Sequence, residues 1–151
     1  MKLKVKMAIC ALVLIAGVVA LTTGAATLTA ASERKGELHV MKECSKHKGR
    51  AGDYCTITSS NIEAIIPGSR VFYALAADVP PGALDSDVVL DAGTGNRAIG
   101  HCTLDLGTGA GLCNFSDGTG QFAGFKARVE VSTRDGLNFS WDGTYTFERV
   151  K

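Results

Sequence analysis

Hydrophobic and polar residues alternate along most of the chain beyond residue 37, with the period of two that is typical of β-strands. The pattern is clearest in the stretch 125–134, where apolar residues alternate with mostly charged ones, and in 137–147, where aromatic residues gather on one face. Asp135-Gly136 between these two stretches indicates a tight hairpin turn. The complete set of predicted strands is 38–44, 54–60, 70–77, 85–92, 98–106, 111–115, 125–134 and 137–147.

Turns rich in glycine, proline and aspartate separate these strands, and no stretch between them has a convincing helical period. Short strands that recur about every 15 residues with such turns predict an all-β protein, which is either a two-layer sandwich or a barrel. The chain shows no internal repeat and no low-complexity linker. We therefore expect a single all-β domain.

The segment around Cys102 and Cys113 is predicted to form a β-hairpin. If these two cysteines lie opposite each other, a two-residue loop remains at Gly107-Thr108. Directly opposed residues of an antiparallel pair have Cα atoms about 4.5–5.5 Å apart, which is within the range of disulfides. The cysteine spacing and the glycine-rich turn therefore support the same hairpin.

A GTGxFxG motif follows the hairpin. Three glycines around one phenylalanine indicate a compact turn pinned by a buried ring, because glycine allows the positive φ angles that tight turns need. The motif and the alternating strand after it resemble the signature of the allene oxide cyclase and dirigent barrels, in which similar GGTGxFxG and GGTGxFxxARG sequences precede a strand. The resemblance covers roughly residues 98–147. The motif residues are Gly118, Thr119, Gly120, Phe122 and Gly124.

The resemblance implies an eight-stranded antiparallel barrel related to the calycins, and a homotrimer. Dirigent proteins guide the coupling of phenoxy radicals, whereas allene oxide cyclases close an unsaturated epoxide inside an apolar cavity by steering its conformation. Alignment on the glycines places Lys126 where dirigent proteins have an arginine and Ala127 where they have a glycine. Lysine keeps the charge of arginine but lacks its planar fork. The resemblance therefore implies the architecture more strongly than the dirigent activity.

The first 31 residues are predicted to be a secretory signal peptide. Three lysines form its basic start, residues 7–21 form its apolar centre, and small residues follow. An apolar run of about 15 residues is short for a membrane span, and an uncleaved anchor is the alternative. Cleavage after Ala26 or near Ala31 leaves one barrel domain at 32–151, which is expected to be secreted or periplasmic and free of the membrane.

Removal of this segment changes the charge balance. Lys+Arg falls from 16 to 13 against 15 Asp+Glu, so the exported domain has a net charge of −2. Such a balance favours neither nucleic acid nor an anionic membrane surface as a partner. We therefore expect a small neutral ligand, or no ligand.

Four of the five cysteines remain in the exported domain, an even number that favours two disulfides in an oxidising compartment. Four cysteines allow three pairings, and the equal spacings favour Cys44 with Cys55 and Cys102 with Cys113. A zinc site is the alternative, but the chain has no CxxC pair and its histidines lack ligand spacing. We therefore expect neither a metal nor a cofactor.

The sequence leaves open which face of the strands lines the barrel. If the aromatic face of 125–134 and 137–147 points inward, the lumen is a dry core and the charged faces are solvated. We favour this arrangement, because side chains usually fill small eight-stranded barrels. If the polar faces point inward instead, a charged cavity results. Its residues would be Asp85, Asp87, His101, Asp105, Lys126 and Arg128.

Candidate functional residues follow from these two arrangements, since the chain contains no specific catalytic motif such as GxSxG or HExxH. The candidates for catalysis are Asp85, Asp87, His101 and Lys126, although a solvated strand face explains them more simply. The candidates for ligand binding are Phe122, Trp141 and Tyr145, whose rings could instead pack in the core or between subunits.

The leading hypothesis is an exported, disulfide-braced barrel that binds a small hydrophobic ligand. If it is catalytic, we expect a cofactor-free isomerase or cyclase in which the shape of the cavity does most of the work. The alternative is a non-enzymatic extracytoplasmic protein whose barrel is filled and whose outer surface binds a partner.

Overall fold

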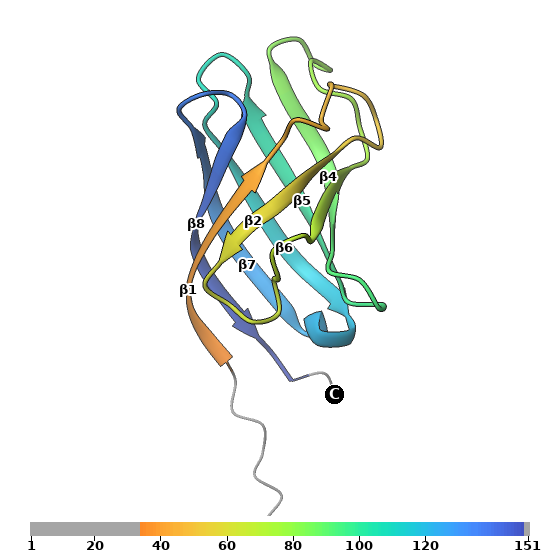
Figure 1. The fold of residues 1–151 in the computed structure, drawn as a ribbon, viewed down its shortest axis with the longest axis vertical. Coiled ribbons are helices and arrows are strands. Elements are labelled where there is room, and N and C mark those ends of the chain that lie inside the picture. The colour runs from red at the N-terminus through yellow and green to blue at the C-terminus, as the bar shows by residue number, and fades with distance from the viewer. Residues whose placement is uncertain (1–33, 150–151) are drawn as a thin grey trace, which may run out of the picture. The chain divides into compact units, whose positions relative to one another are not determined.

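A computed structural model describes residues 34–149, and the predicted signal peptide lies outside the described residues. The described chain forms eight strands and one short 3₁₀ turn (Figure 1). All eight predicted strands are confirmed in position, and β2 has the predicted bounds at both ends. The elements are β1 (Arg34–Glu43), β2 (Tyr54–Ser60), β3 (Arg70–Tyr73), β4 (Ala83–Asp91), β5 (Arg97–Asp105), β6 (Gly111–Thr119), η1 (Gly120–Phe122), β7 (Phe125–Thr133) and β8 (Asn138–Phe147).

The strands form a closed antiparallel barrel, which confirms the predicted fold class and excludes the sandwich. Each strand pairs with the next along the chain, and β8 closes the barrel by pairing with β1. The β1–β8 register runs without interruption from Arg34 opposite Phe147 to Glu43 opposite Asn138. Because the sheet is closed, it presents no free strand edge to other chains.

Three strand ends differ from the predicted ones by four residues: those of β1, β3 and β6, and β6 continues past the predicted end at Phe115 to Thr119. β1 begins at Arg34, four residues before the predicted start, and the Arg34 guanidinium lies 4.2 Å from the centre of the Phe147 ring on β8. This polar segment forms a strand because it pairs with β8, from Arg34 opposite Phe147 to Glu37 opposite Thr144. β3 ends at Tyr73 because the chain turns there, and the Leu75 N–H donates to Ser86 Oγ at 3.0 Å.

The apolar face of each strand points into the barrel, as we favoured. Every second residue of β7 from Phe125 to Val131 is buried, and the residues between are exposed. The alternative, a lumen lined by charges, is wrong. An ion inside an eight-stranded barrel would lose its hydration without gaining enough partners. All six residues proposed for that lumen are exposed on the outer face: Asp85, Asp87, His101, Asp105, Lys126 and Arg128.

Aromatic rings fill one end of the lumen. The ring of Phe125 is central, with centroid distances of 5.3 Å to Phe122, 5.0 Å to Phe147 and 6.0 Å to Phe115. Trp141 packs on Phe115 at 5.3 Å and is 1% exposed. Offset and edge-to-face packing of this kind stabilises a core beyond the burial of area alone.

The GTGxFxG segment forms the corner between β6 and β7 at this filled end, which is the lower end in Figure 1. Phe122 is fully buried, which confirms the predicted turn pinned by one ring. Thr119 Oγ1 donates to the Gly95 carbonyl at 2.7 Å, and the Gln121 N–H donates to Asn96 Oδ1 at 2.9 Å. The corner is thereby tied to the β4–β5 turn.

Both predicted disulfides are confirmed, Cys44–Cys55 and Cys102–Cys113, and the latter pair lies opposite in the β5–β6 register. The predicted two-residue loop at Gly107-Thr108 is wrong, because pairing ends at Leu104 and Gly111. The loop is wider because a carboxylate organises it. Asp105 Oδ1 accepts the Thr108 N–H at 2.7 Å, and its carbonyl accepts the Gly109 N–H at 2.8 Å.

Candidate functional site

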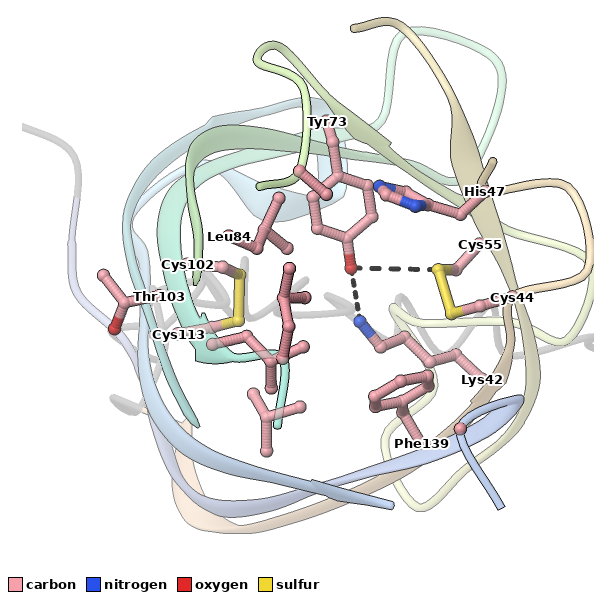
Figure 2. A pocket seen from close by; sticks show the side chains of 15 residues that line it. Lys42, Cys44, His47, Cys55, Tyr73, Leu84, Cys102, Thr103, Cys113 and Phe139 are labelled. Carbon is pink, nitrogen blue, oxygen red and sulfur yellow. Dashed lines mark hydrogen bonds between the residues drawn. A yellow bond between two sulfur atoms is a disulfide. The ribbon is translucent and has the colours of Figure 1, made fainter. Parts of the chain in front are cut away.

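A cavity of about 180 Å³ occupies the other end of the lumen. Four hairpin loops surround it, those after β1, β3, β5 and β7, which lie together at the upper end in Figure 1. Its walls are largely apolar, and the two disulfides lie on opposite sides of it (Figure 2). The side chains that matter most for its chemistry are Lys42, His47 and Tyr73.

Lys42 brings an amine into this wall. It follows Leu38 and Val40 at inward positions of β1 and is only 3% exposed. Its Nζ donates to Tyr73 Oη at 2.5 Å (Figure 2). Three rings surround the same nitrogen, with centroids 5.2 Å away for Tyr73, 5.5 Å for Phe139 and 4.6 Å for Trp141. Cation–π contact gives the ammonium form partial compensation for its lost hydration.

No carboxylate forms an ion pair with Lys42 among residues 34–149. Burial therefore lowers the pKa of Lys42 to about 7, since an apolar environment disfavours the charged amine. Burial also raises the pKa of Tyr73, so its hydroxyl stays protonated. The cavity thus holds an amine that is about half uncharged at neutral pH and largely uncharged at mildly basic pH, beside a hydroxyl that keeps its proton.

Tyr73 connects the amine to one of the disulfides. Its Oη lies 3.8 Å from Cys55 Sγ, and because a disulfide sulfur carries no hydrogen, the hydroxyl is the donor in this weak contact. Figure 2 shows the hydroxyl between Lys42 and the Cys44–Cys55 bridge. The disulfide holds the ends of β1 and β2 together, and so helps to keep this wall of the cavity in place.

His47 enters the cavity wall from the β1–β2 loop. Its ring packs edge-on against Tyr73, with centroids 4.7 Å apart and an interplanar angle of 87°. Burial lowers the pKa of His47, and the nearby Lys42 lowers it further against the opposing effect of Asp53. Nδ1 accepts the Gly49 N–H at 3.3 Å, which leaves the proton of the neutral ring on Nε2. Nε2 is buried and has no partner among the described residues.

The Tyr73 hydroxyl is a donor that an acceptor oxygen can use, and Lys42 supplies an amine beside it. The cavity volume is close to that of an engineered apolar cavity of about 150 Å³ that binds benzene. The arrangement can therefore hold a ring-sized apolar molecule that carries one oxygen.

Three of the four catalytic candidates come together on the outer surface, not in the cavity. His101 on β5 contacts two carboxylates of β4, with Nε2 2.7 Å from Asp85 Oδ1 and Nδ1 2.8 Å from Asp87 Oδ1. The hydrogen bonds to Asp87 and Asp85 raise the pKa of His101. Lys126 lies apart from them and pairs with Glu148 at 2.8 Å.

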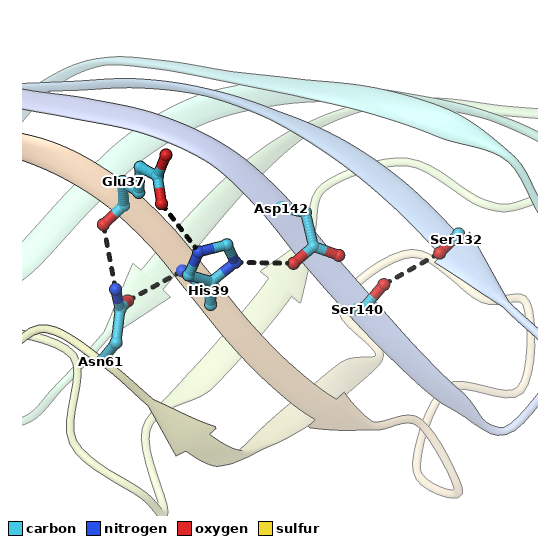
Figure 3. Close-up of polar contacts among 6 residues, drawn as sticks. All are labelled: Glu37, His39, Asn61, Ser132, Ser140 and Asp142. Atoms are coloured by element: carbon cyan, nitrogen blue, oxygen red, sulfur yellow. Dashed lines mark hydrogen bonds and ion pairs between the residues drawn. The ribbon is translucent and has the colours of Figure 1, made fainter.

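A similar exposed cluster surrounds His39 (Figure 3). Nδ1 of His39 lies 2.9 Å from Asp142 Oδ1, and Nε2 lies 3.5 Å from Glu37 Oε2. The hydrogen bonds to Asp142 and Glu37 raise the pKa of His39. Asn61 joins the cluster by accepting the His39 N–H at 2.7 Å. These contacts tie the loop after β2 to β1 and β8, and they explain the cluster without a ligand.

The three candidate ligand-binding rings do not line the cavity. Phe122 and Tyr145 lie at the filled end, where the Tyr145 ring is 5.8 Å from that of Phe147. Trp141 reaches the site only indirectly, through its ring against Lys42. The residues that do line the cavity were missed from the sequence. One signal was available: Lys42 shares the inward face of its alternating strand with two aliphatic residues.

No group of three or more histidine, cysteine, aspartate or glutamate side chains is placed to hold a metal ion within the part of the chain that the structure describes. Residues 34–149 also contain no helix that is long and apolar enough to cross a membrane. No protein-family model matches the chain, and no curated protein or solved structure matches it either.

Proposed function

We propose that the barrel binds one small, mainly apolar molecule with an acceptor oxygen in the cavity at its open end. The observation that carries this proposal is the buried Lys42 amine, which faces an apolar cavity of about 180 Å³ without a carboxylate partner. Burying an amine without a counter-ion costs free energy. A core side chain that only filled space would be a leucine or methionine, so a binding role explains why a lysine occupies this position.

The proposal agrees with the resemblance to allene oxide cyclases, in which an apolar barrel cavity steers a small substrate. If the protein is an enzyme, we propose a cofactor-free isomerase or cyclase reaction in the same cavity. Catalysis would then depend on holding the substrate in a reactive conformation beside the amine and the Tyr73 hydroxyl. The predicted export of the chain places this activity outside the cytoplasm.

Ligand-dependent stability tests the binding proposal. A pool of small apolar compounds is added to the purified protein, and bound molecules are identified by mass spectrometry after gel filtration. A bound compound should raise the free energy of unfolding by about 3 kcal/mol at a hundredfold excess over its Kd. The proposal would be contradicted if the protein carried no bound molecule, either as purified or after incubation with the pool.

A cavity-filling variant shows where the molecule binds. Leu104→Trp places a large ring in the cavity wall and should abolish the ligand-dependent gain. Glu130→Trp adds the same ring at an exposed position of β7 and should leave the gain unchanged. An equal gain in both variants would place the ligand elsewhere.

The outer surface supports the trimer that the resemblance implies. Four apolar side chains form a continuous cross-strand row on the outside of β2 to β5, and Ile99 at its end is 48% exposed. The other three side chains of the row are partly exposed, and an outward-facing apolar row of this kind favours association. We therefore propose this face as the contact between subunits. The row consists of Tyr54, Phe72, Val89 and Ile99.

A further inference from the structure

We infer that Lys42 binds its ligand covalently, and that its Nζ forms a reversible imine with a small aldehyde or ketone that enters the cavity. This inference rests on the proposed binding of a small apolar molecule and adds the chemical class of that molecule. Three features of the cavity carry it: the position of the amine, the lack of an acidic partner, and the Tyr73 hydroxyl beside it.

The amine is placed where its lone pair can react. Lys42 Nζ is held by Tyr73 Oη and enclosed by three rings, which keep it at the cavity wall. An uncharged amine is the nucleophile in imine formation, and desolvation in an apolar pocket is a known way to produce one. The lowered pKa of about 7 agrees with this geometry. An exposed lysine stays almost wholly protonated at neutral pH.

The Tyr73 hydroxyl can donate and accept the protons that imine formation requires. The Nζ lone pair attacks the carbonyl carbon and forms a C–N bond, while the C=O π pair moves to oxygen and takes a proton from Tyr73 Oη. The amine then loses its two protons, one returning to Tyr73 and one leaving with the hydroxyl, so that one water molecule is released and the imine remains. No oxidant, reductant or metal is needed.

The cavity also limits which carbonyl compounds fit. Its volume of about 180 Å³ admits a single aromatic ring or a short chain. The walls around Lys42 offer apolar contacts from Leu104, Val131 and Phe139. A monocyclic or short aliphatic aldehyde or ketone meets these conditions. A carboxylic acid is the competing ligand class, since it could pair with the ammonium form without any covalent step.

Reductive trapping tests the inference. The protein is incubated at neutral pH with benzaldehyde and sodium cyanoborohydride, which reduces an imine to a stable amine, and peptide mapping then locates the benzyl group. We expect Lys42 to be labelled at least about tenfold faster than surface lysines, because far more of its amine is uncharged. Lys126, which is half exposed, serves as the internal reference.

Variants and a second probe separate the possible outcomes. Lys42→Met should lose the rapid labelling, Lys126→Met should keep it, and Tyr73→Phe should slow it. Benzyl alcohol, which has no carbonyl, should raise the melting temperature of both the wild type and Tyr73→Phe. Because the peptide map reads the wild-type protein, the result does not depend on whether a variant folds.

Two results would overturn the inference. If benzyl alcohol or benzoate binds in the cavity but Lys42 is labelled no faster than Lys126, the covalent role fails and the proposed binding function stands. If none of these compounds binds and Lys42 is not labelled selectively, both fail.

Discussion

At the scale of single residues, Lys42 sets the chemistry of the cavity and also weakens the fold. Its ammonium form faces Tyr73 and His47, the titratable groups that contact or line the site beside it, and neither carries a compensating negative charge. The unfolded chain therefore binds this proton more tightly than the folded barrel does. The stability of the protein should consequently depend on pH in a way that one residue controls.

We predict that the free energy of unfolding rises between about pH 7 and pH 10, because the pKa of Lys42 is about 7 in the folded state, against 10.5 for a lysine side chain in water. Below pH 7 both the folded and the unfolded chain bind the Lys42 proton, and the contribution of Lys42 to the free energy of unfolding is then at its lowest. The full difference is on the order of 5 kcal/mol. Above about pH 10 the raised pKa of Tyr73 acts in the opposite direction, because the unfolded chain then loses the tyrosine proton first.

Lys42→Met should remove this dependence and raise stability at neutral pH by about 1–3 kcal/mol, since methionine fills similar space without a charge. Denaturant titrations at several pH values measure both effects. Lys126→Met, at an exposed position, is the control and should retain the slope. An unchanged slope in Lys42→Met would show that other groups produce it.

The His101 cluster gives a second prediction at this scale. Hydrogen bonds to Asp87 and Asp85 raise the folded-state pKa of His101, so the contacts stabilise the barrel below pH 6.5 and this contribution is lost as the pH rises through the folded-state pKa. Asp87→Asn should lower the His101 pKa, as followed by the imidazole NMR signals, and leave that of His39 unchanged. Equal titration in wild type and variant would mean that the contact does not persist in solution.

At the scale of elements, the corner between β6 and β7 depends on close packing against a glycine. A Cβ on Gly118 would lie 2.5 Å from Phe122 Cβ and 2.7 Å from the Arg97 carbonyl oxygen. Real side chains do not approach so closely, so the corner would have to open and partly expose the Phe122 ring. Gly36 on β1 offers a contrast, because a Cβ there would make ordinary contacts of 3.4 Å or more with Tyr145.

Gly118→Ala should therefore lower the free energy of unfolding by about 2 kcal/mol or more. Gly36→Ala should be neutral or slightly stabilising, because alanine restricts the unfolded chain. Thermal unfolding of the two variants beside the wild type gives the comparison. Similar effects from both substitutions would show that the contacts of Gly118 are not what requires a glycine.

The same elements show what a sequence reveals. Strands such as β7 were predictable because a period of two is a local property, and the opposed cysteines set the β5–β6 register. The loop from 106 to 110 could not be predicted in this way. Its width depends on the Asp105 carboxylate, which accepts the backbone N–H and the side-chain hydroxyl of Thr108. The pattern of hydrophobic residues along the chain does not indicate such a contact.

The cavity was harder to predict than the strands. Lys42 could be placed on an inward face from its own strand, but its neighbours Tyr73 and Phe139 come from β3 and β8 and meet it only when the barrel closes. His47 lies in a basic loop whose residues read as solvated. The charged candidates His101 and Asp87 were brought together by the β4–β5 register, yet on the outside of the barrel.

At the scale of the whole molecule, the closed barrel has no free strand edge, so self-association would use side-chain surface such as the outer apolar row. We predict that the exported domain is a trimer by light scattering and that Ile99→Lys shifts it to the monomer, because a charge in a packed contact is costly. Leu137→Lys, at a residue that is 42% exposed and outside the row, should remain trimeric. A monomeric wild type would refute the proposed assembly.

The end of the lumen that aromatic rings fill determines how a ligand can enter and leave the cavity. The phenylalanine rings around Phe125 fill one end of the lumen. A ligand that contacts Lys42 must therefore enter and leave through the same opening between the hairpin loops. A bound molecule must then leave before another can enter, and both pass the loops that carry His47 and Gly136. A molecule bound at this opening would therefore block access to the cavity without contacting the Lys42 amine.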